Sequence, residues 1–241
     1  MDIQSTIWNI LFCLVLVGTT ALNAQIRPAV YISDNFNIRH ELKIDNHYMV
    51  YTEYQQSPPK FIRTIGGFTS FEATPEMRLV VLLEFNSNYK KDSLRRLTIP
   101  IKIDGENLVL DWPFKMTFTP LPVLKKKQDL EGAWLFATRG PDEGQERRGE
   151  ENPRKTLKYL QDDRFQWIAY TTDTFEFFGT GGGTFSSQDG KYVENIDFFS
   201  KDDTRVGATL DFNYEIKDGD WHHTGENSKG EPLYEIWAPR K

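Results

Sequence analysis

The chain has 241 residues and a formal net charge of −6 at pH 7, and 14% of its residues are aromatic. This mildly acidic balance shows no basic stripe and argues against a nucleic-acid-binding protein. The only basic run, Lys125–Lys127, follows two prolines and is interpreted as a solvated linker. The single cysteine, Cys13, lies in an N-terminal apolar run. The rest of the chain must therefore build its core without disulfides.

Residues 1–24 have the pattern of a secretory signal peptide. The unbroken apolar run Ile10–Val17 is followed by small residues up to Ala24. The run is too short to span a bilayer comfortably. We expect cleavage near Ala24 and a periplasmic or secreted mature protein. The n-region contains Asp2 and no Lys or Arg, so an uncleaved N-terminal anchor stays open as an alternative. A lipoprotein would need a cysteine at the end of the apolar run.

Almost every periodic stretch alternates with period two, which is typical of half-buried strands. Leu210, Phe212 and Tyr214 share one strand face, for example, and Asp211 and Asn213 share the other. No stretch predicts a long helix. The expected fold class is therefore all-β.

The two halves of the chain resemble each other. Five blocks match in the same order and at a nearly constant offset, beginning at His40 and Thr156, Lys60 and Thr174, Arg78 and Lys191, Leu97 and Ala208, and Met116 and Glu235. Such a series is hard to produce by chance, so it predicts a tandem duplication.

Each copy has the length and turn pattern of a small barrel. In the second copy we expect eight strands, at about 131–138, 156–160, 164–171, 174–185, 191–199, 206–217, 219–224 and 232–238. Eight sequential strands on short hairpin loops predict an up-and-down antiparallel barrel. The predicted organisation is a signal peptide (1–24), a first barrel (25–119), a linker (120–129) and a second barrel (130–241).

Both copies carry glycines in the fourth strand, at Gly66–Gly67 and Gly181–Gly183. Glycine within a strand indicates a sharp bend or a bulge, which a long barrel strand needs in order to coil. A phosphate-binding loop would require a helix to begin after the glycines. The residues that follow predict strand and turn instead.

The stretch LEGAW, which contains Gly132 and Trp134, resembles the Gly-x-Trp of the first strand in lipocalin-like (calycin) barrels. The C-terminal DWHHTGENSKGEPLYEIWAPRK resembles the last hairpin of such domains in exported bacterial proteins, mostly of unknown function. The resemblance implies that Trp134 packs at the closed end under a basic residue of the last strand, by position Arg240. It also implies binding of a small, largely apolar ligand and no reaction. The first copy lacks Gly-x-Trp and shares the assignment only through the repeat.

The candidate ligand-binding residues are aromatic positions of the second copy together with one histidine: Trp167, Phe175, Phe177, Phe198, Phe212, Tyr214 and His223. They could line an open cup or fill the barrel as its core. His223 shares a strand face with Trp221 and could supply a polar contact in an aromatic cup, or lie at the surface. A register slip of one residue would exchange the two faces of any strand.

The charged, Gly-rich segment 139–155 joins the first two strands of the second copy. In the barrels that this copy resembles, that connection lies over the open end. The segment is interpreted either as a ligand gate or as a solvated loop.

The sequence predicts no metal site, no cofactor and no catalytic residues. His222 and His223 are adjacent and point to opposite faces of a strand, with no cysteine or third histidine nearby. There is no nucleophile elbow. A carboxylate pair could still meet in space, for example Glu194 with Asp197 or Glu215.

Three functions remain open. The first is a non-enzymatic exported protein that holds a small hydrophobic or amphipathic ligand in a barrel. The alternative is an envelope module with filled barrels that binds a protein or glycan through its loops, and the third is an enzyme. A cavity of about 300 Å³ or more would favour the first, and an exposed apolar patch on a filled barrel the second. Carboxylates or histidines converging in a cleft would favour the third. The sequence predicts neither the ligand nor the oligomeric state.

Overall fold

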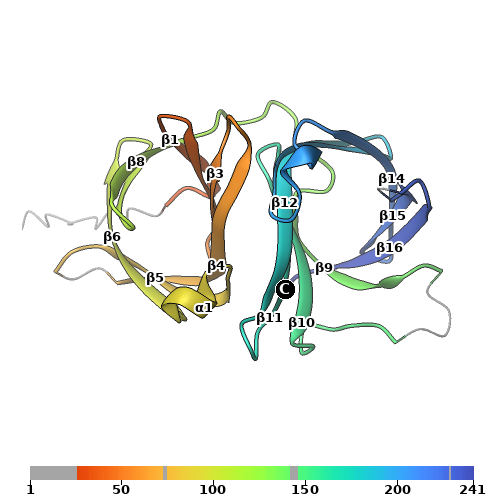
Figure 1. The fold of residues 1–241 in the computed structure, drawn as a ribbon, viewed down its shortest axis with the longest axis horizontal. Helices are drawn as coiled ribbons and strands as arrows, with labels where there is room; N and C mark the ends of the chain where they lie inside the picture. The colour runs from red at the N-terminus through yellow and green to blue at the C-terminus, as the bar shows by residue number, and fades with distance from the viewer. Residues whose placement is uncertain (1–25, 73–74, 142–145, 228) are drawn as a thin grey trace, which may run out of the picture.

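The computed structural model describes residues 26–72, 75–141, 146–227 and 229–241, so the expected signal peptide lies outside the described residues. The chain forms two closed eight-stranded antiparallel barrels side by side (Figure 1). This confirms the predicted all-β fold class with two tandem barrels, and it is consistent with a calycin-like fold.

Both barrels are up-and-down meanders in which each strand pairs with its neighbour in sequence and the last strand pairs with the first. The first barrel comprises β1 (Ala29–Asn35), β2 (Ile38–Ile44), β3 (Tyr48–Gln55), β4 (Lys60–Glu72), β5 (Arg78–Asn86), α1 (Tyr89–Asp92), β6 (Arg96–Asp104), β7 (Asn107–Asp111) and β8 (Lys115–Pro120). The second comprises β9 (Gly132–Arg139), β10 (Arg154–Gln161), β11 (Arg164–Thr171), β12 (Phe177–Gln188), β13 (Lys191–Phe199), η1 (Asp203–Arg205), β14 (Thr209–Lys217), β15 (Asp220–Glu226) and β16 (Pro232–Pro239).

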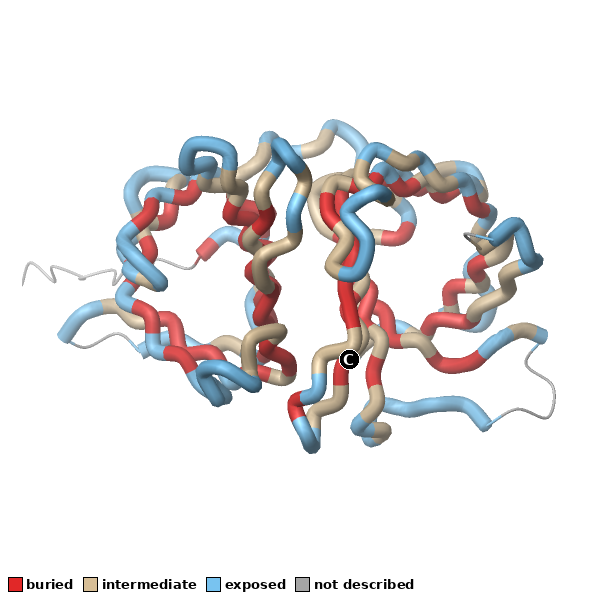
Figure 2. Tube along the Cα trace, in the orientation of Figure 1, coloured by how far each residue is buried: buried red, intermediate tan, exposed pale blue. Residues whose placement is uncertain are grey.

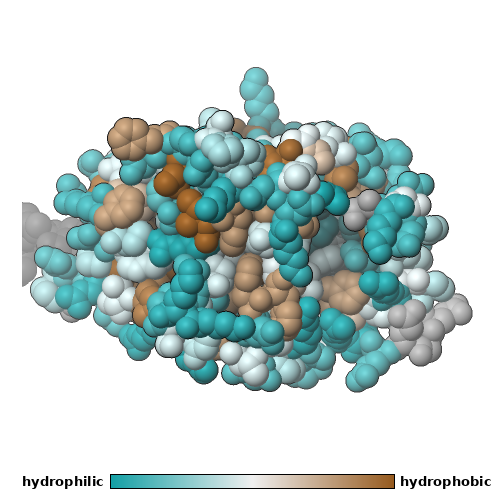
Figure 3. Space-filling model, viewed as in Figure 1, coloured by the Kyte–Doolittle hydropathy of each residue, from teal (hydrophilic) through white to brown (hydrophobic). Residues whose placement is uncertain are grey.

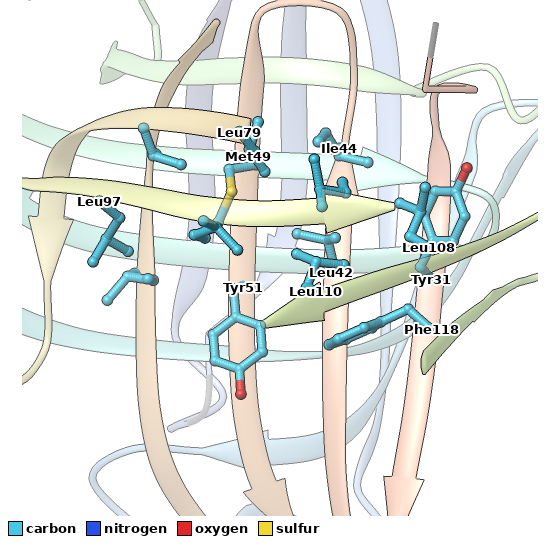
Figure 4. Close-up of a cluster of buried hydrophobic side chains, with 14 of the residues drawn as sticks. Tyr31, Leu42, Ile44, Met49, Tyr51, Leu79, Leu97, Leu108, Leu110 and Phe118 are labelled. Atoms are coloured by element: carbon cyan, nitrogen blue, oxygen red, sulfur yellow. The ribbon is translucent and has the colours of Figure 1, made fainter. Parts of the chain in front are cut away.

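The interior of the first barrel is a packed apolar core. Alternate residues of its strands point inward, and aliphatic side chains such as Leu42, Leu79 and Leu110 meet there with Tyr51 and Phe118 (Figure 4). Figure 2 shows buried residues along the strands of both barrels, including the strands along which the barrels meet.

Each barrel has a β-bulge opposite a glycine pair of its longest strand: β5 has one extra residue facing Gly66–Gly67 of β4, and β13 has one facing Gly182–Gly183 of β12. A Cβ on the first glycine of each pair would lie 2.4 Å from the Phe85 ring or 2.5 Å from the Phe198 ring. The glycines therefore let a ring pack directly on the backbone where the strand bends. This agrees with the structural interpretation of the glycine clusters.

The repeat extends to individual hydrogen bonds. The Thr64 hydroxyl donates to the backbone oxygen of Tyr51 at 2.9 Å, and the Thr180 hydroxyl donates to that of Trp167 at 2.5 Å. The backbone NH of each threonine donates to a serine hydroxyl at 2.9 Å. These matching bonds align β3 with β11 and β4 with β12 residue by residue.

The barrels pack against each other through the outer faces of β3 to β5 and of β11 to β13. Tyr54 packs on Phe198 with ring centroids 4.7 Å apart, and Tyr170 packs on Phe85 at 5.0 Å. The repeat converts one pair into the other. The interface is therefore approximately two-fold symmetric, and it buries aromatic rings contributed by both barrels.

At the centre of this interface lies Gln166, which is fully buried. Its amide NH₂ donates to the hydroxyls of Thr64 and Thr180 at 3.1 and 3.0 Å, and its carbonyl oxygen accepts from Thr52 at 2.8 Å. Because a buried amide is costly unless it is hydrogen-bonded, this network holds the barrels in one arrangement.

Candidate functional site

The second barrel contains a cavity of about 430 Å³. Its apolar wall consists of Phe136, Trp167, Leu210, Phe212, Leu233 and Trp237. The volume exceeds the roughly 300 Å³ at which ligand pockets begin. An apolar wall of this size is suited to the body of a small organic molecule.

The cavity lies toward one end of the barrel. Two-residue turns close the opposite end, where the indole NH of Trp134 donates to the backbone oxygen of Leu130 at 2.9 Å. The mouth is lined by Arg139 and Arg148 beside the β9–β10 connection and by Glu226. The connection leaves β9 at this end, but it also reaches the other half of the barrel, where Arg147 bonds Asp220 next to the β14–β15 turn at 2.6 Å and Glu150 accepts from the backbone NH of Lys241 at 2.6 Å. Residues 142–145 of this connection lie outside the described ones.

A buried ion pair forms the floor of the cavity. Lys158 and Glu194 are only 5% and 4% exposed, and Nζ of Lys158 lies 3.0 Å from Oε1 of Glu194. The Tyr192 hydroxyl donates to the same oxygen at 2.7 Å. Burial, reinforced by the Glu194 charge, raises the pKa of Tyr192 well above its usual value. The Lys158 ammonium also lies 4.8 Å from the Trp221 ring and 5.1 Å from the Trp237 ring.

A second polar pair stands on the neighbouring wall. Nδ1 of His223 lies 3.5 Å from Oε2 of Glu235, and neither ring nitrogen of this 2%-exposed histidine has a well-aligned partner among the described residues. Burial and the nearby Lys158 charge lower the pKa of His223. Burial acts to raise the pKa of Glu235, but the proximity of His223 and Lys158 outweighs it and keeps that pKa below its ordinary value.

The first barrel places aliphatic residues at all four of these positions. The strand registers align Leu42 with Lys158, Val81 with Glu194, Leu110 with His223 and Met116 with Glu235. The same barrel thus folds with an apolar interior. Buried charges are costly unless they are paired, so the four ionisable groups are not a requirement of the fold. Ionisable groups gathered in a cavity are the usual mark of a functional site.

The two barrels also differ at the level of the mouth. In the first barrel this level is filled by bonded side chains: Arg63 donates to Glu53 at 2.8 Å, and the His40 ring lies 2.7 Å from the Tyr51 hydroxyl. The positions of His40, Glu53 and Arg63 correspond in the second barrel to Thr156, Ala169 and Gly179. Smaller residues at these three positions leave the cavity open.

Three of the seven candidate ligand-binding residues, Trp167, Phe212 and His223, line the cavity. Tyr214 belongs to the interior cluster but lies toward the closed end, where its hydroxyl donates to Asp129.

The other three candidates lie outside the barrel interior. Phe198 packs on Tyr54 in the inter-barrel interface, because the bulge opposite Gly182–Gly183 shifts the alternation of β13 and turns Phe199 inward instead. Phe177, at the start of β12, stacks on Phe61.

Phe175 is in a left-handed conformation (φ 56°) in the β11–β12 turn and reaches Tyr89 of the first barrel, with ring centroids 4.9 Å apart. It therefore belongs to the inter-barrel contact rather than to the cavity.

Lys158 and Glu235 were missed in the sequence analysis, and Glu194 was paired with the wrong carboxylates. Asp197 bonds Arg164 outside the barrel at 2.7 Å, and Glu215 is exposed. The sequence signal that could have identified Lys158 is the alternation of β10. Leu160 faces inward, so the residue two positions before it also faces the interior.

The role expected for Arg240 is corrected by the structure. Trp134 is buried near the closed end, as the resemblance implied, but Arg240 does not cover it. Arg240 bonds Glu84 of the first barrel at 2.7 Å and lies 4.3 Å from the Tyr48 ring. The chain end thus ties the two barrels together, and the cation above the tryptophan cluster is Lys158.

His222 and His223 occupy opposite faces of β15, as predicted, and the His222 ring bonds the Tyr234 hydroxyl at 2.9 Å. Within the described ranges, no three His, Cys, Asp or Glu side chains gather closely enough to hold a metal ion. In the same part of the chain, no helix has the length and apolar character needed to cross a membrane. Comparisons with models of protein families and with curated proteins gave no match.

Proposed function

We propose that this chain is an exported, non-enzymatic, lipocalin-like binding protein that holds a small amphipathic molecule in the cup of its second barrel. The observation that carries the proposal is the convergence of Lys158, Glu194, His223 and Glu235 on a cavity of about 430 Å³. The equivalent positions of the first barrel are aliphatic. Export after cleavage near Ala24 belongs to the same proposal.

The composition of the cup supports an amphipathic ligand rather than a purely apolar one. Small-molecule sites combine an apolar wall with a few converging polar groups that fix the orientation of the ligand. The apolar wall includes Trp167, Phe212 and Trp237, and Glu235 contributes a carboxylate that faces the cavity. The apolar part of the ligand would contact the rings, and its polar end would reach the carboxylate.

The proposal is tested with the chain expressed without residues 1–24. Native mass spectrometry would detect a co-purified molecule, and quenching of Trp167 and Trp237 would report uptake of added lipophiles. We expect one molecule per chain. A Lys158→Leu/Glu194→Val variant, which restores the first-barrel residues, should lose uptake. The matched control is Lys217→Leu/Glu215→Val, which removes an exposed ion pair of the same barrel and should keep it. A clean apo mass with no uptake would shift the proposal to the envelope module that binds a protein or glycan.

Two observations keep other functions in view. Phe36 is fully exposed at a turn with φ 57°, and apolar groups stand among hydrophilic ones on the face drawn in Figure 3, which fits a module that binds through its loops.

The approach of Glu235 to His223 favours an enzyme that transfers protons. An enzyme would convert the bound molecule, and Glu235→Gln would abolish conversion while leaving binding measurable.

A further inference from the structure

This inference rests on the proposed function and concerns the charge of the ligand. Three cationic and three anionic side chains line the described part of the cavity: Arg139, Arg148 and Lys158, and Glu194, Glu226 and Glu235. Their formal charges cancel.

The balance is also local. Lys158 is paired with Glu194 at 3.0 Å. Arg139 stands directly opposite Glu235 in the β9–β16 register, because the irregularity in this ladder brings it to the inner side. The remaining charges, Arg148 and Glu226, both lie at the mouth.

The histidine of the cup adds no charge near neutral pH. Burial and the Lys158 ammonium lower the pKa of His223 below the usual value of about 6.5. The groups that face it are Glu235 on β16, Lys158 on β10, and Tyr192 and Glu194 on β13.

We propose that the ligand is an uncharged amphipathic molecule whose polar head carries a hydroxyl. An ion entering the cup would lose its hydration without meeting an opposite charge that is not already balanced. A hydroxyl loses far less hydration and can donate to the Glu235 carboxylate. Among the described residues, this carboxylate otherwise accepts only from the Trp237 indole NH at 3.2 Å and faces His223. The alkyl or aromatic body then lies against Phe136 and Trp167.

The experiment uses three probes that differ only in the head group: decan-1-ol, decanoic acid and decylamine, with octyl and dodecyl analogues. Tryptophan quenching at pH 7.5 would give the three dissociation constants. We expect the alcohol to bind at least about tenfold more tightly than either ion, which corresponds to about 1.4 kcal/mol.

Variants that change the net charge of the cup should bind one of the two ions more tightly than the unmodified protein does. Glu235→Gln makes the cup one unit more positive and should improve decanoate binding about tenfold while weakening decylamine binding. Arg139→Gln should do the reverse, and it stands at the mouth, where it is not needed for the core. Glu215→Gln, on the exposed outer side of β14, should change none of the three constants.

The outcomes separate the inference from the function on which it rests. If decanoate or decylamine binds the unmodified protein as tightly as decanol, the ligand-charge inference is overturned while the binding function stands. If no probe of any length binds, both are overturned. If the two cup variants fail to move the preference for ions in opposite directions, charge balance is not what selects the ligand.

Discussion

Leu42 and Lys158 occupy the same position in the two barrels. Leu42 pairs with Tyr51 and Lys158 pairs with Trp167, and the backbone oxygen of each aromatic residue accepts the threonine hydrogen bond that both barrels share. An aliphatic residue and a buried ammonium thus stand at equivalent sites of one architecture. The first barrel therefore shows which residues the same fold accepts at the positions that form the cup of the second.

Replacing the ion pair as a unit should leave the protein stable. Lys158→Leu/Glu194→Val should keep the free energy of unfolding within about 2 kcal/mol of that of the unmodified chain, because removing two desolvated charges offsets the loss of the acceptor of the buried Tyr192 hydroxyl. Glu194→Val alone should cost about 3–5 kcal/mol, because it leaves Lys158 buried without its partner. Urea unfolding measures both. Equal losses in the single and double variants would contradict this account.

The side-chain amide of Gln166, at the centre of the interface, should contribute strongly to the stability of the protein. Gln166→Ala removes three hydrogen bonds and leaves a gap between the barrels, so we expect a loss of about 2–4 kcal/mol. Thermal unfolding would measure it. The control is Gln188→Ala, which removes only an exposed contact with Lys126. An unchanged midpoint for the Gln166 variant would show that the network does not hold the barrels together.

The two bulge glycines of β12 should respond differently to rescue. A Cβ at Gly182 would meet the Phe198 ring at 2.5 Å and the backbone oxygen of Phe165 at 2.6 Å, whereas a Cβ at Gly183 would meet only backbone atoms, the nearest being the oxygen of Asn195 at 1.9 Å. Both alanine variants should be destabilised by at least about 2 kcal/mol.

Adding Phe198→Leu should restore part of the stability lost in Gly182→Ala, because it removes the ring contact and leaves only the contact with the Phe165 oxygen. It should restore none in Gly183→Ala, where the obstacle is backbone. Unfolding midpoints of the two double variants decide the matter, and equal rescue would refute this interpretation.

Stability should fall as the pH drops below about 6.5. The folded-state pKa of His223 is lowered, so below the unfolded-state value of about 6.5 the unfolded chain binds more protons than the folded one. The loss continues until the pH reaches the folded-state pKa. His40, also buried with a lowered pKa, contributes in the same direction.

His223→Leu, which restores the first-barrel residue, should therefore remove roughly half of the slope, which is at most about 1.4 kcal/mol per pH unit for each histidine. Measurements of unfolding free energy between pH 7.5 and 5 would show it. A slope identical to that of the unmodified chain would mean that His223 titrates alike in both states.

The architecture could be predicted because the alternation of side chains and the short turns are local properties of the chain. All eight strands expected in the second copy are present within a few residues of their predicted ends. Which side chains face inward depends on bulges, and the bulge in β13 exchanges the faces of Phe198 and Phe199. The glycines of β12 predict an irregularity at this level, but they do not show that the extra residue falls in β13, and this decides which of the two rings faces inward.

The candidate site was predicted only in part because its wall depends on contacts between distant strands. Phe177 has a strand pattern like that of any inward residue, yet it stacks on Phe61 of the other barrel. Conversely, Lys158 was passed over because a lysine on an alternating strand is ordinarily exposed. Its partner Glu194 lies three strands away around the barrel, so the pair becomes visible only when the sheet is closed.

The approximate two-fold interface has a consequence for how this chain could acquire new binding properties. The interface between the two barrels is made from outer strand faces. The interior of either barrel can therefore change without disturbing this interface. The first barrel has four apolar residues at the positions where the second has Lys158, Glu194, His223 and Glu235. On the proposed function, substitutions inside the second barrel could therefore alter the ligand while the contact between the barrels stays the same.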